Sequence, residues 1–106
     1  MFSRILTMHP KSNSITKLTT ALEEQVLPQL RKQEGFKDEI FFLSPDTKDA
    51  VVISFWDRKE QAEAYGRTAY PQVLQSVKDL LEETPQVKNY DIVSSTFIKT
   101  GVKATV

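Results

Sequence analysis

The sequence contains no cysteine, and this absence excludes several kinds of site. Without thiols the chain cannot form disulfides, a thiolate zinc site, an iron–sulfur cluster or a cysteine nucleophile. It has a single histidine, His9, so one chain cannot build a histidine-based metal cluster. Its glycines, Gly35, Gly66 and Gly101, lie too far apart for a glycine-rich phosphate loop. We therefore expect no metal site and no bound cofactor.

Net charge and long hydrophobic runs are also lacking. The 14 Lys and Arg residues balance 14 Asp and Glu residues, and the basic residues are scattered, so there is no basic patch for DNA or RNA. No stretch approaches the roughly 18 apolar residues that suggest a membrane span. The apolar residues 1–8 are too few for the core of a signal peptide. We expect a cytoplasmic protein that binds neither nucleic acid nor membrane.

What the chain does contain is the composition of one folded domain. Of its 106 residues, 40% are hydrophobic and 26% are charged, which is ordinary for a globular protein. By surface scaling, a chain of this size buries about two thirds of the surface that it exposes when unfolded. We expect residues 1–106 to form a single domain whose core needs no disulfide or metal.

Hydrophobic periodicity divides the chain into strands and helices. The predicted strands span 2–9, 35–43, 50–56 and 87–99. The first predicted helix spans 13–33, and Pro28 should kink it. The second helix begins after Asp57, which we expect to cap it, breaks between Gly66 and Tyr70, and ends at Pro85. The order β-α-β-β-α-β predicts a ferredoxin-like α+β fold, with two helices on one face of a four-stranded antiparallel sheet.

The predicted strands have large apolar residues on both faces. Residues 40–43 and 51–53 are continuously apolar, and Phe55 and Trp56 extend the pattern. Two helices cover only one face of such a sheet. Leaving the other face in water would forgo about 1.5–3 kcal/mol of burial for each large side chain. The same face of a second copy is the simplest cover, so we predict a homodimer with its sheets packed face to face.

Polar aromatic residues gather around the second predicted helix and are the candidate site residues. Trp56 ends the third strand, Tyr65 and Tyr70 lie on the two helical pieces, and Arg67 lies between them. Such side chains can stack on a flat substrate and donate a hydrogen bond to a phenolate or enolate oxygen. His9 is a candidate for proton transfer because histidine exchanges protons near neutral pH.

Each candidate also has a purely structural interpretation. Trp56 can be a core residue at the end of a strand. Tyr65 and Tyr70 can lie at the edge of the core with their hydroxyls in water. Arg67 can be a solvated or interface charge, and His9 can be a hydrogen-bonding residue of a loop.

Several segments together resemble the antibiotic biosynthesis monooxygenase-like domain. They are Gly35-Phe36 after the first helix, the hairpin ending in residues 51–57, the helix at 60–65 and the break at 68–70. The resemblance covers nearly the whole chain. Members of that family are dimeric α+β barrels, so the resemblance implies the same fold and the same kind of homodimer.

The resemblance also implies an activity. The family includes cofactor-independent monooxygenases acting on polycyclic aromatic phenols, in which the deprotonated substrate reacts with O₂ directly in an apolar pocket. It also includes haem-degrading enzymes, which use an Asn in strand one, a Trp on the second helix and a later His. These positions fall near Ser3, on Tyr65 and near Gln75. All three residues differ from the haem-degrading pattern, so we do not expect haem degradation.

Three hypotheses follow. In the first, a small oxygenase holds a quinol or polyphenol between the sheet and the second helix, with Tyr65 and His9 catalytic and with Trp56, Tyr65, Tyr70 and Arg67 binding the substrate. In the second, a non-catalytic module binds a small apolar or aromatic ligand in the same cleft. In the third, a dimeric scaffold fills the pocket with its own side chains. An open cleft lined by Tyr65, Tyr70 and Trp56 would favour the first two, whereas a closed one would leave the scaffold.

Overall fold

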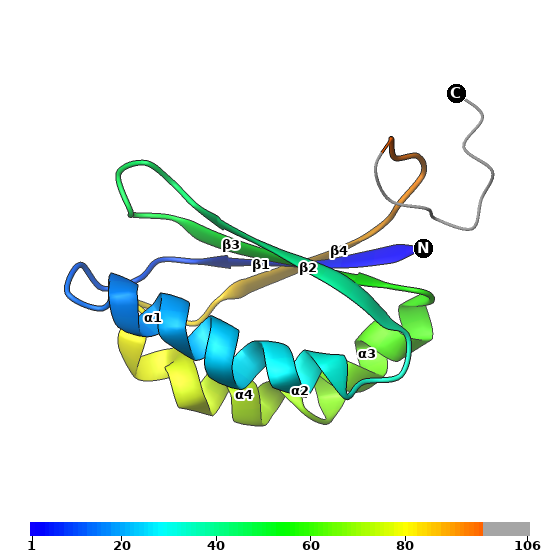
Figure 1. Cartoon of the computed structure of the whole chain (residues 1–106), viewed down its shortest axis with the longest axis horizontal. Coiled ribbons are helices and arrows are strands. Elements are labelled where there is room, and N and C mark those ends of the chain that lie inside the picture. The colour runs from blue at the N-terminus through cyan, green and yellow to red at the C-terminus, as the bar shows by residue number, and fades with distance from the viewer. Residues whose placement is uncertain (97–106) are drawn as a thin grey trace.

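The computed structural model describes residues 1–96, which form a four-stranded antiparallel sheet with helices on one face (Figure 1). The strands are β1 (Phe2–Met8), β2 (Phe36–Leu43), β3 (Ala50–Trp56) and β4 (Gln86–Asp91). Their order in the sheet is β2-β3-β1-β4, which places β1 and β3 in the centre. The predicted ferredoxin-like α+β fold is confirmed.

Two helical segments cover one face of this sheet (Figure 1). The first consists of α1 (Ile15–Ala21), a π-helical turn η1 (Leu22–Val26) and α2 (Leu27–Arg31). The second consists of α3 (Lys59–Arg67), α4 (Tyr70–Val77) and a 3-10 turn η2 (Lys78–Leu80). Within residues 1–96, none of these helices is long and apolar enough to cross a membrane.

The first helical segment accommodates Pro28 through its π-helical turn. Proline has no N–H to donate to the carbonyl four residues earlier, so a regular helix loses a hydrogen bond there. In η1 the N–H of Leu27 instead donates to the carbonyl of Leu22, five residues earlier. The chain therefore continues as a helix past Pro28, and the wider turn carries the buried side chains of Leu22 and Val26.

The last strand, β4, ends earlier than predicted. Asp91 pairs with Phe2, and the N–H of Ile92 donates to the carbonyl of Met1 at 2.9 Å. Residues 92–96 are not in a strand. The remainder of the predicted strand, 97–99, lies outside the described residues.

The start of α3 also differs from the prediction. Asp57 is not the cap; its carboxylate lies 3.4 Å from Nζ of Lys37. Arg58 precedes the helix, and its N–H donates to Oε1 of Gln61 at 3.1 Å. Gly35 lies beneath the same Gln61 side chain with φ +84°, a backbone conformation that favours glycine.

The core fills the space between the sheet and the helices. Its largest fully enclosed side chains are Trp56, Met8, Leu18 and Leu30, contributed by both layers. The core therefore joins each helical segment to the sheet and sets the distance between them.

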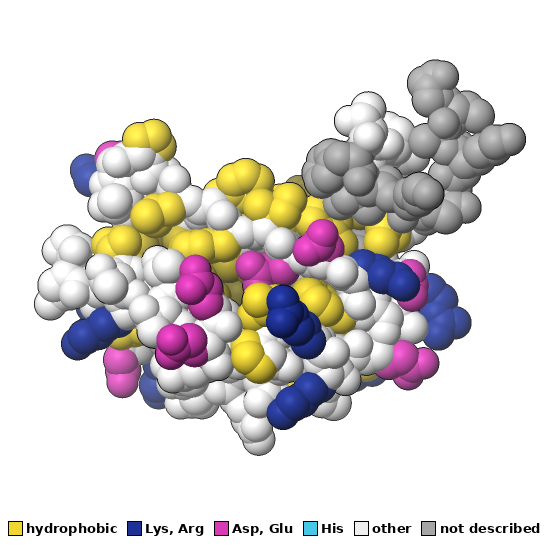
Figure 2. Space-filling model, viewed as in Figure 1, with side chains coloured by type: hydrophobic (Ala, Val, Ile, Leu, Met, Phe, Trp, Pro, Cys, Tyr) yellow, Lys and Arg dark blue, Asp and Glu magenta, His cyan; other side chains and the backbone are white. Residues whose placement is uncertain are grey.

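The opposite side of the sheet, called here the open face, carries apolar side chains in register. Its apolar residues include Ile5, Ile40, Phe42, Val51, Ile53 and Phe55, which alternate along their strands with residues of the helix-covered side. Phe42 is 50% exposed. Figure 2 shows hydrophobic side chains gathered along the sheet side of the molecule. The apolar second face expected from the sequence is therefore present.

Candidate active site

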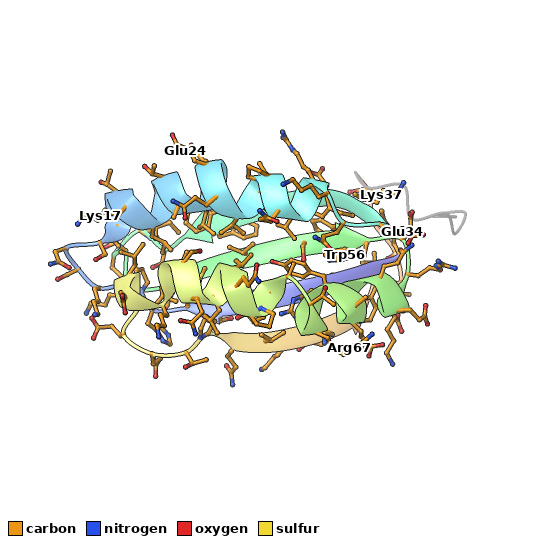
Figure 3. All side chains as sticks on the ribbon, turned by 90° about the horizontal axis from the view of Figure 1, so that it is seen from below. Lys17, Glu24, Glu34, Lys37, Trp56 and Arg67 are labelled. Carbon is orange, nitrogen blue, oxygen red and sulfur yellow. The ribbon has the colours of Figure 1, made fainter. Side chains whose placement is uncertain are left out.

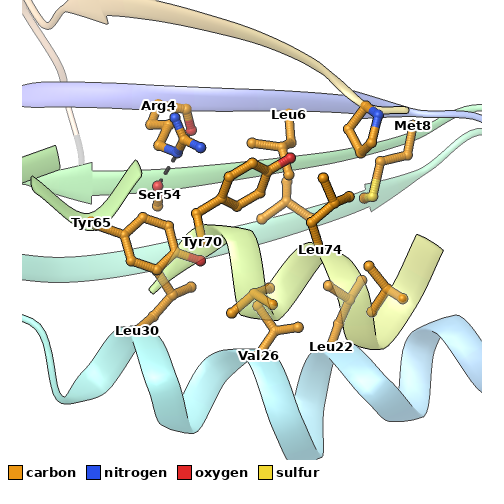
Figure 4. Close-up of a pocket in the computed structure, with 14 residues that line it drawn as sticks. Arg4, Leu6, Met8, Leu22, Val26, Leu30, Ser54, Tyr65, Tyr70 and Leu74 are labelled. Carbon is orange, nitrogen blue, oxygen red and sulfur yellow. Dashed lines mark hydrogen bonds between the residues drawn. The ribbon is translucent and has the colours of Figure 1, made fainter. Parts of the chain in front are cut away.

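A cavity of about 30 Å³ lies between the sheet and the helices (Figure 4). Most of its lining is aliphatic and comes from β1, the two helical segments and β3. The polar side chains of the lining are Arg4, Ser54, Tyr65 and Tyr70. They form one group at the end of the cavity nearest α3, so any chemistry of the cavity must depend on them.

Arg4 is the charged residue of this group. It lies on the helix-covered side of β1, is only 7% exposed, and pairs in register with Ser54 of β3. Its guanidinium carbon lies 4.4 Å from the ring centroid of Tyr70 and 5.6 Å from that of Tyr65. These are cation–π distances, so the two tyrosine rings favour the positive charge.

A glycine on α3 makes room for this guanidinium. A Cβ atom at Gly66 would lie 3.4 Å from Nη1 of Arg4, so the helix backbone passes directly beside the charge. Gly66 belongs to the last turn of α3, and the C-terminal end of a helix favours a cation.

Tyr65 and Tyr70 bring two phenol groups to the cavity. Burial raises the pKa of Tyr65 to about 12, against the opposing effect of Arg4. Burial also raises the pKa of Tyr70, again against Arg4. Both hydroxyls therefore keep their protons at neutral pH and can donate hydrogen bonds.

A row of aromatic rings holds the tyrosines in place. The ring centroids of Tyr65 and Tyr70 are 6.1 Å apart, and Trp56 lies 5.4 Å from Tyr65 on the other side. Trp56 is fully buried, and its indole Nε1 donates to Oγ of Ser54 at 2.9 Å. Trp56 does not line the cavity, so it would act on a ligand only by positioning Tyr65 and Ser54.

Two polar atoms of this group have no hydrogen-bond partner within residues 1–96. They are Nε of Arg4 and the hydroxyl oxygen of Tyr70, and both are buried. Buried polar groups in folded proteins are normally paired, so an unpaired atom needs an explanation. Here two such atoms belong to residues that touch each other and line the same cavity.

The structure does not bring His9 to this group. His9 is five residues along an extended strand from Arg4, roughly 16 Å away by strand geometry. Its Nδ1 lies 2.5 Å from a carboxylate oxygen of Glu83 and its Nε2 lies 3.2 Å from one of Asp49. The ring is half exposed and is not part of the cavity lining.

Arg67 is also outside the cavity. It lies in the last turn of α3, is exposed, and projects from the outer edge of that helix (Figure 3). The arginine beside the tyrosines is Arg4 instead, which we had not singled out from the sequence. The available signal was its position, because Arg4 shares one face of a strand with Phe2, Leu6 and Met8.

The part of the chain that the structure describes contains no group of three His, Asp or Glu residues placed to hold a metal ion. Glu39, on β2, pairs in register with Ser54 and so lies two strands from Arg4. Burial raises the pKa of Glu39, with Asp38 adding to the effect. Its Oε2 is buried and has no hydrogen-bond partner within residues 1–96.

Comparison with known proteins identifies the fold. No protein-family model and no curated protein matches the sequence. Among solved structures, Rv0793 from Mycobacterium tuberculosis has a TM-score of 0.72 and 17% identity, covering 90% of this chain and 97% of that one. A monooxygenase from the gene ActVA-Orf6 of Streptomyces coelicolor, in complex with the ligand nanaomycin D, has a TM-score of 0.77 and 14% identity over 92% of both chains.

A structure named antibiotic biosynthesis monooxygenase has a TM-score of 0.69 and 14% identity, covering 88% of this chain and 99% of its own. At these identities the likeness establishes the fold and leaves the chemistry to be argued from the cavity. The resemblance noted in the sequence is confirmed at this level: the chain has the fold of the antibiotic biosynthesis monooxygenase-like proteins.

Proposed function

We propose that the protein is a small cofactor-independent oxygenase that acts on an aromatic phenol, quinol or anthrone bound between the sheet and the second helical segment. One observation carries the proposal. The cavity is apolar except for one group of polar side chains, and two polar atoms of that group are buried without a partner. Such a lining suits a flat apolar molecule with an oxygen at one end.

An anthrone illustrates the chemistry that this cavity would host. Its CH₂ group becomes C=O, one oxygen atom of O₂ enters the product, and the other leaves as water with the two hydrogens. The four electrons come from the substrate, so no separate reductant takes part. In this reaction Tyr65 and Tyr70 donate hydrogen bonds to the substrate oxygen and stabilise negative charge that develops on it.

We do not give His9 a role in this proposal. Both nitrogens of its ring contact carboxylates at the exposed end of the sheet. Tyr65 and Tyr70, by contrast, line the cavity and touch Arg4.

The size of the cavity sets a condition on binding. A volume of about 30 Å³ holds a water molecule or so, far less than an aromatic ligand. A ligand must therefore displace lining side chains, and those of Tyr70 and Leu74 on α4 are only partly buried. We expect α4 to move when the cavity is filled.

Oxygen uptake with anthrone and a panel of naphthoquinols tests the proposal. Tyr65→Phe and Tyr70→Phe should each lower kcat/KM by about ten-fold to a hundred-fold, the value of a hydrogen bond to a charged group. The matched control is Tyr90→Phe, because Tyr90 is 53% exposed on β4 and does not line the cavity. His9→Ala should leave turnover unchanged. Absence of uptake with every substrate would contradict the oxygenase.

The second candidate function is a non-catalytic module that binds a small aromatic ligand in the same cavity. The observation favouring it is that, among residues 1–96, the lining contains no His, Asp or Glu that could accept a proton. Ligand retained in native mass spectra, combined with no oxygen uptake, would support the module. If nothing binds and nothing is oxidised, the scaffold hypothesis stands alone.

We also propose that the protein is a homodimer, joined through the open face. Ile5, Ile40, Phe42, Val51 and Ile53 present a continuous apolar surface on central and edge strands. A two-fold axis brings the same surface of a second copy onto it and buries both. The helices and the cavity lie on the other side of the sheet, so this association leaves the cavity accessible.

A further inference from the structure

Arg4 is a buried cation without a counter-charge. It is 7% exposed, and no carboxylate among residues 1–96 lies within ion-pair distance of it. Charged side chains are almost never fully buried unless they are paired, because leaving water is costly for an ion. The position of Arg4 therefore needs a reason beyond packing.

The immediate surroundings support the charge but leave it unpaired. The rings of Tyr70 and Tyr65 accept it through their faces, and the last turn of α3 passes beside it at Gly66. None of these contacts gives the Nε–H of Arg4 an acceptor, and that atom is buried. Arg4 lines the apolar cavity, and its buried Nε–H lacks an oxygen to bind.

Tyr70 supplies a second unpaired group at the same place. Its hydroxyl is buried without a partner, and its ring lies 4.4 Å from the guanidinium of Arg4. Arginine only donates hydrogen bonds, and tyrosine with its proton donates one. Two donors and one positive charge are complementary to a single oxygen that carries negative charge.

We propose that the cavity binds its aromatic ligand as an anion, with an ionised oxygen of the ligand accepting hydrogen bonds from Nε of Arg4 and the hydroxyl of Tyr70. This inference rests on the proposed function and narrows its substrate class to acidic phenols, hydroxyquinones and aromatic carboxylates. It also removes the need for a base in the cavity. A nearby cation stabilises the ionised form of a phenol, so Arg4 would select the electron-rich species that O₂ attacks.

Few other titratable groups face Arg4. From α3 and α4 the titratable groups facing Arg4 are Tyr65 and Tyr70, and from β2 the nearest is Glu39, one strand beyond Ser54. Burial keeps the proton on all three more firmly than usual. Both tyrosines are therefore uncharged at neutral pH and do not oppose an anionic ligand, and Glu39 lies two strands away from Arg4.

A matched pair of probes tests the inference. 2-Hydroxy-1,4-naphthoquinone is an anion at neutral pH, and 2-methoxy-1,4-naphthoquinone has the same rings without the charge. Calorimetry should show the anion binding at least about ten-fold more tightly, as a charge-assisted hydrogen bond requires. Amide shifts in NMR spectra should place both probes at the cavity.

Variants of the full chain identify the residue responsible. Arg4→Met should abolish the preference for the anion and fold at least as stably as the wild type, since an apolar side chain replaces a buried charge. Arg4→Lys should keep part of the preference, and Tyr70→Phe should reduce it. The control is Lys17→Met, which removes an exposed positive charge from α1 (Figure 3). It should leave the affinities for the anionic and the neutral probe unchanged.

The outcomes separate the two proposals. If both probes bind the wild type equally, with shifts at the cavity, the anionic ligand is wrong and the proposed function stands. If neither probe binds at the cavity, both proposals are wrong. A preference for the anion that survives in Arg4→Met would overturn the role of Arg4. The first two outcomes need only the wild-type protein and the two probes. They can therefore be decided even if a variant fails to fold.

Discussion

Ser54 joins the buried indole of Trp56 to the central strands. Its Oγ accepts a hydrogen bond from Nε1 of Trp56 at 2.9 Å and donates one to the backbone carbonyl of Arg4 at 3.4 Å. Trp56 in turn packs against Tyr65. One small hydroxyl therefore connects the strand that carries Arg4 to the aromatic row beside the cavity.

Ser54→Ala removes the acceptor of a buried indole N–H. We expect the free energy of unfolding to fall by about 1–3 kcal/mol, the cost of leaving a buried donor unpaired. Urea denaturation measures the change. The control is Ser76→Ala on α4, whose hydroxyl bonds only to the carbonyl of Val73 in its own helix, and it should stay within about 0.5 kcal/mol of the wild type. Equal effects from the two variants would contradict the role of Ser54.

The buried phenol of Tyr65 makes stability depend on alkaline pH. Its pKa is about 12 in the folded protein against an ordinary value of 10.0, because burial disfavours the phenolate. Below pH 10 the phenol of Tyr65 holds its proton in both the folded and the unfolded chain. Its contribution to the free energy of unfolding is then complete and does not change with pH. Between pH 10 and 12 only the unfolded chain loses this proton, so stability should fall with rising pH, by at most about 1.4 kcal/mol per pH unit.

Denaturation curves at a series of alkaline pH values measure this slope. Tyr65→Phe should have a shallower dependence over the same interval, because the group that titrates is gone. Parallel curves for the variant and the wild type would show that Tyr65 does not cause the loss.

Residue types alone could indicate part of the candidate site. Tyr65 and Tyr70 were predicted together, because both lie at a helix break where an aromatic side chain can reach the core edge. His9 was chosen for its chemistry, and the structure places it at the far end of β1 instead. For Arg4 the alternation of β1 indicates the core face, which it shares with Phe2, Leu6 and Met8, but not that Tyr65 and Tyr70 lie opposite it.

At the scale of elements, the break between α3 and α4 is what brings the two tyrosines together. Pro71 lies in the first turn of α4 and has no N–H to donate to the end of α3, so the chain must turn there. Thr68 helps to end α3 through a hydrogen bond from its Oγ1 to the carbonyl of Ala64 at 2.7 Å. Local sequence accounts for this break, and it was predicted.

Two glycines beside the helices should respond differently to alanine. Gly35 has φ +84° and a Cβ there would overlap the side chain of Gln61, so Gly35→Ala should lower the free energy of unfolding by about 1–3 kcal/mol. Gly66 lies inside α3, where a Cβ would make ordinary contact with Arg4. Gly66→Ala should be neutral or stabilising by up to about 1 kcal/mol. The reverse order of stability in urea would contradict this account.

Element boundaries were less predictable than element types. The capping residue of α3 and the end of β4 both differ from the sequence pattern. Asp57 contacts Lys37 instead of capping the helix, and β4 ends at Asp91, which pairs with Phe2 of β1. Both differences depend on neighbours that are distant in sequence, which a local pattern cannot include.

At the scale of the whole molecule, the two sides of the sheet have different surroundings. One side packs against both helical segments and encloses the cavity. Among residues 1–96 no helix covers the open face, and Phe42 on it is half exposed. This asymmetry is the physical basis of the proposed homodimer.

Light scattering after size exclusion should give the mass of two chains at micromolar concentration. Phe42→Asp should shift the protein to a monomer, because it places a charge within the apolar surface that the dimer would bury. Gln72→Asp on α4 is the control, since Gln72 is exposed on the helical side, and it should remain a dimer. A wild type that is monomeric under these conditions would rule out the homodimer.

The sequence by itself determined the order and type of the elements, the apolar second face of the sheet and the pairing of Tyr65 with Tyr70. These features depend on the periodicity of side chains and on prolines and glycines that act within a few residues. Only the tertiary structure decided that Arg4 faces those tyrosines and that His9 and Arg67 do not. That choice depends on strand register and on where each helix crosses the sheet, which are set by packing between residues far apart in the chain.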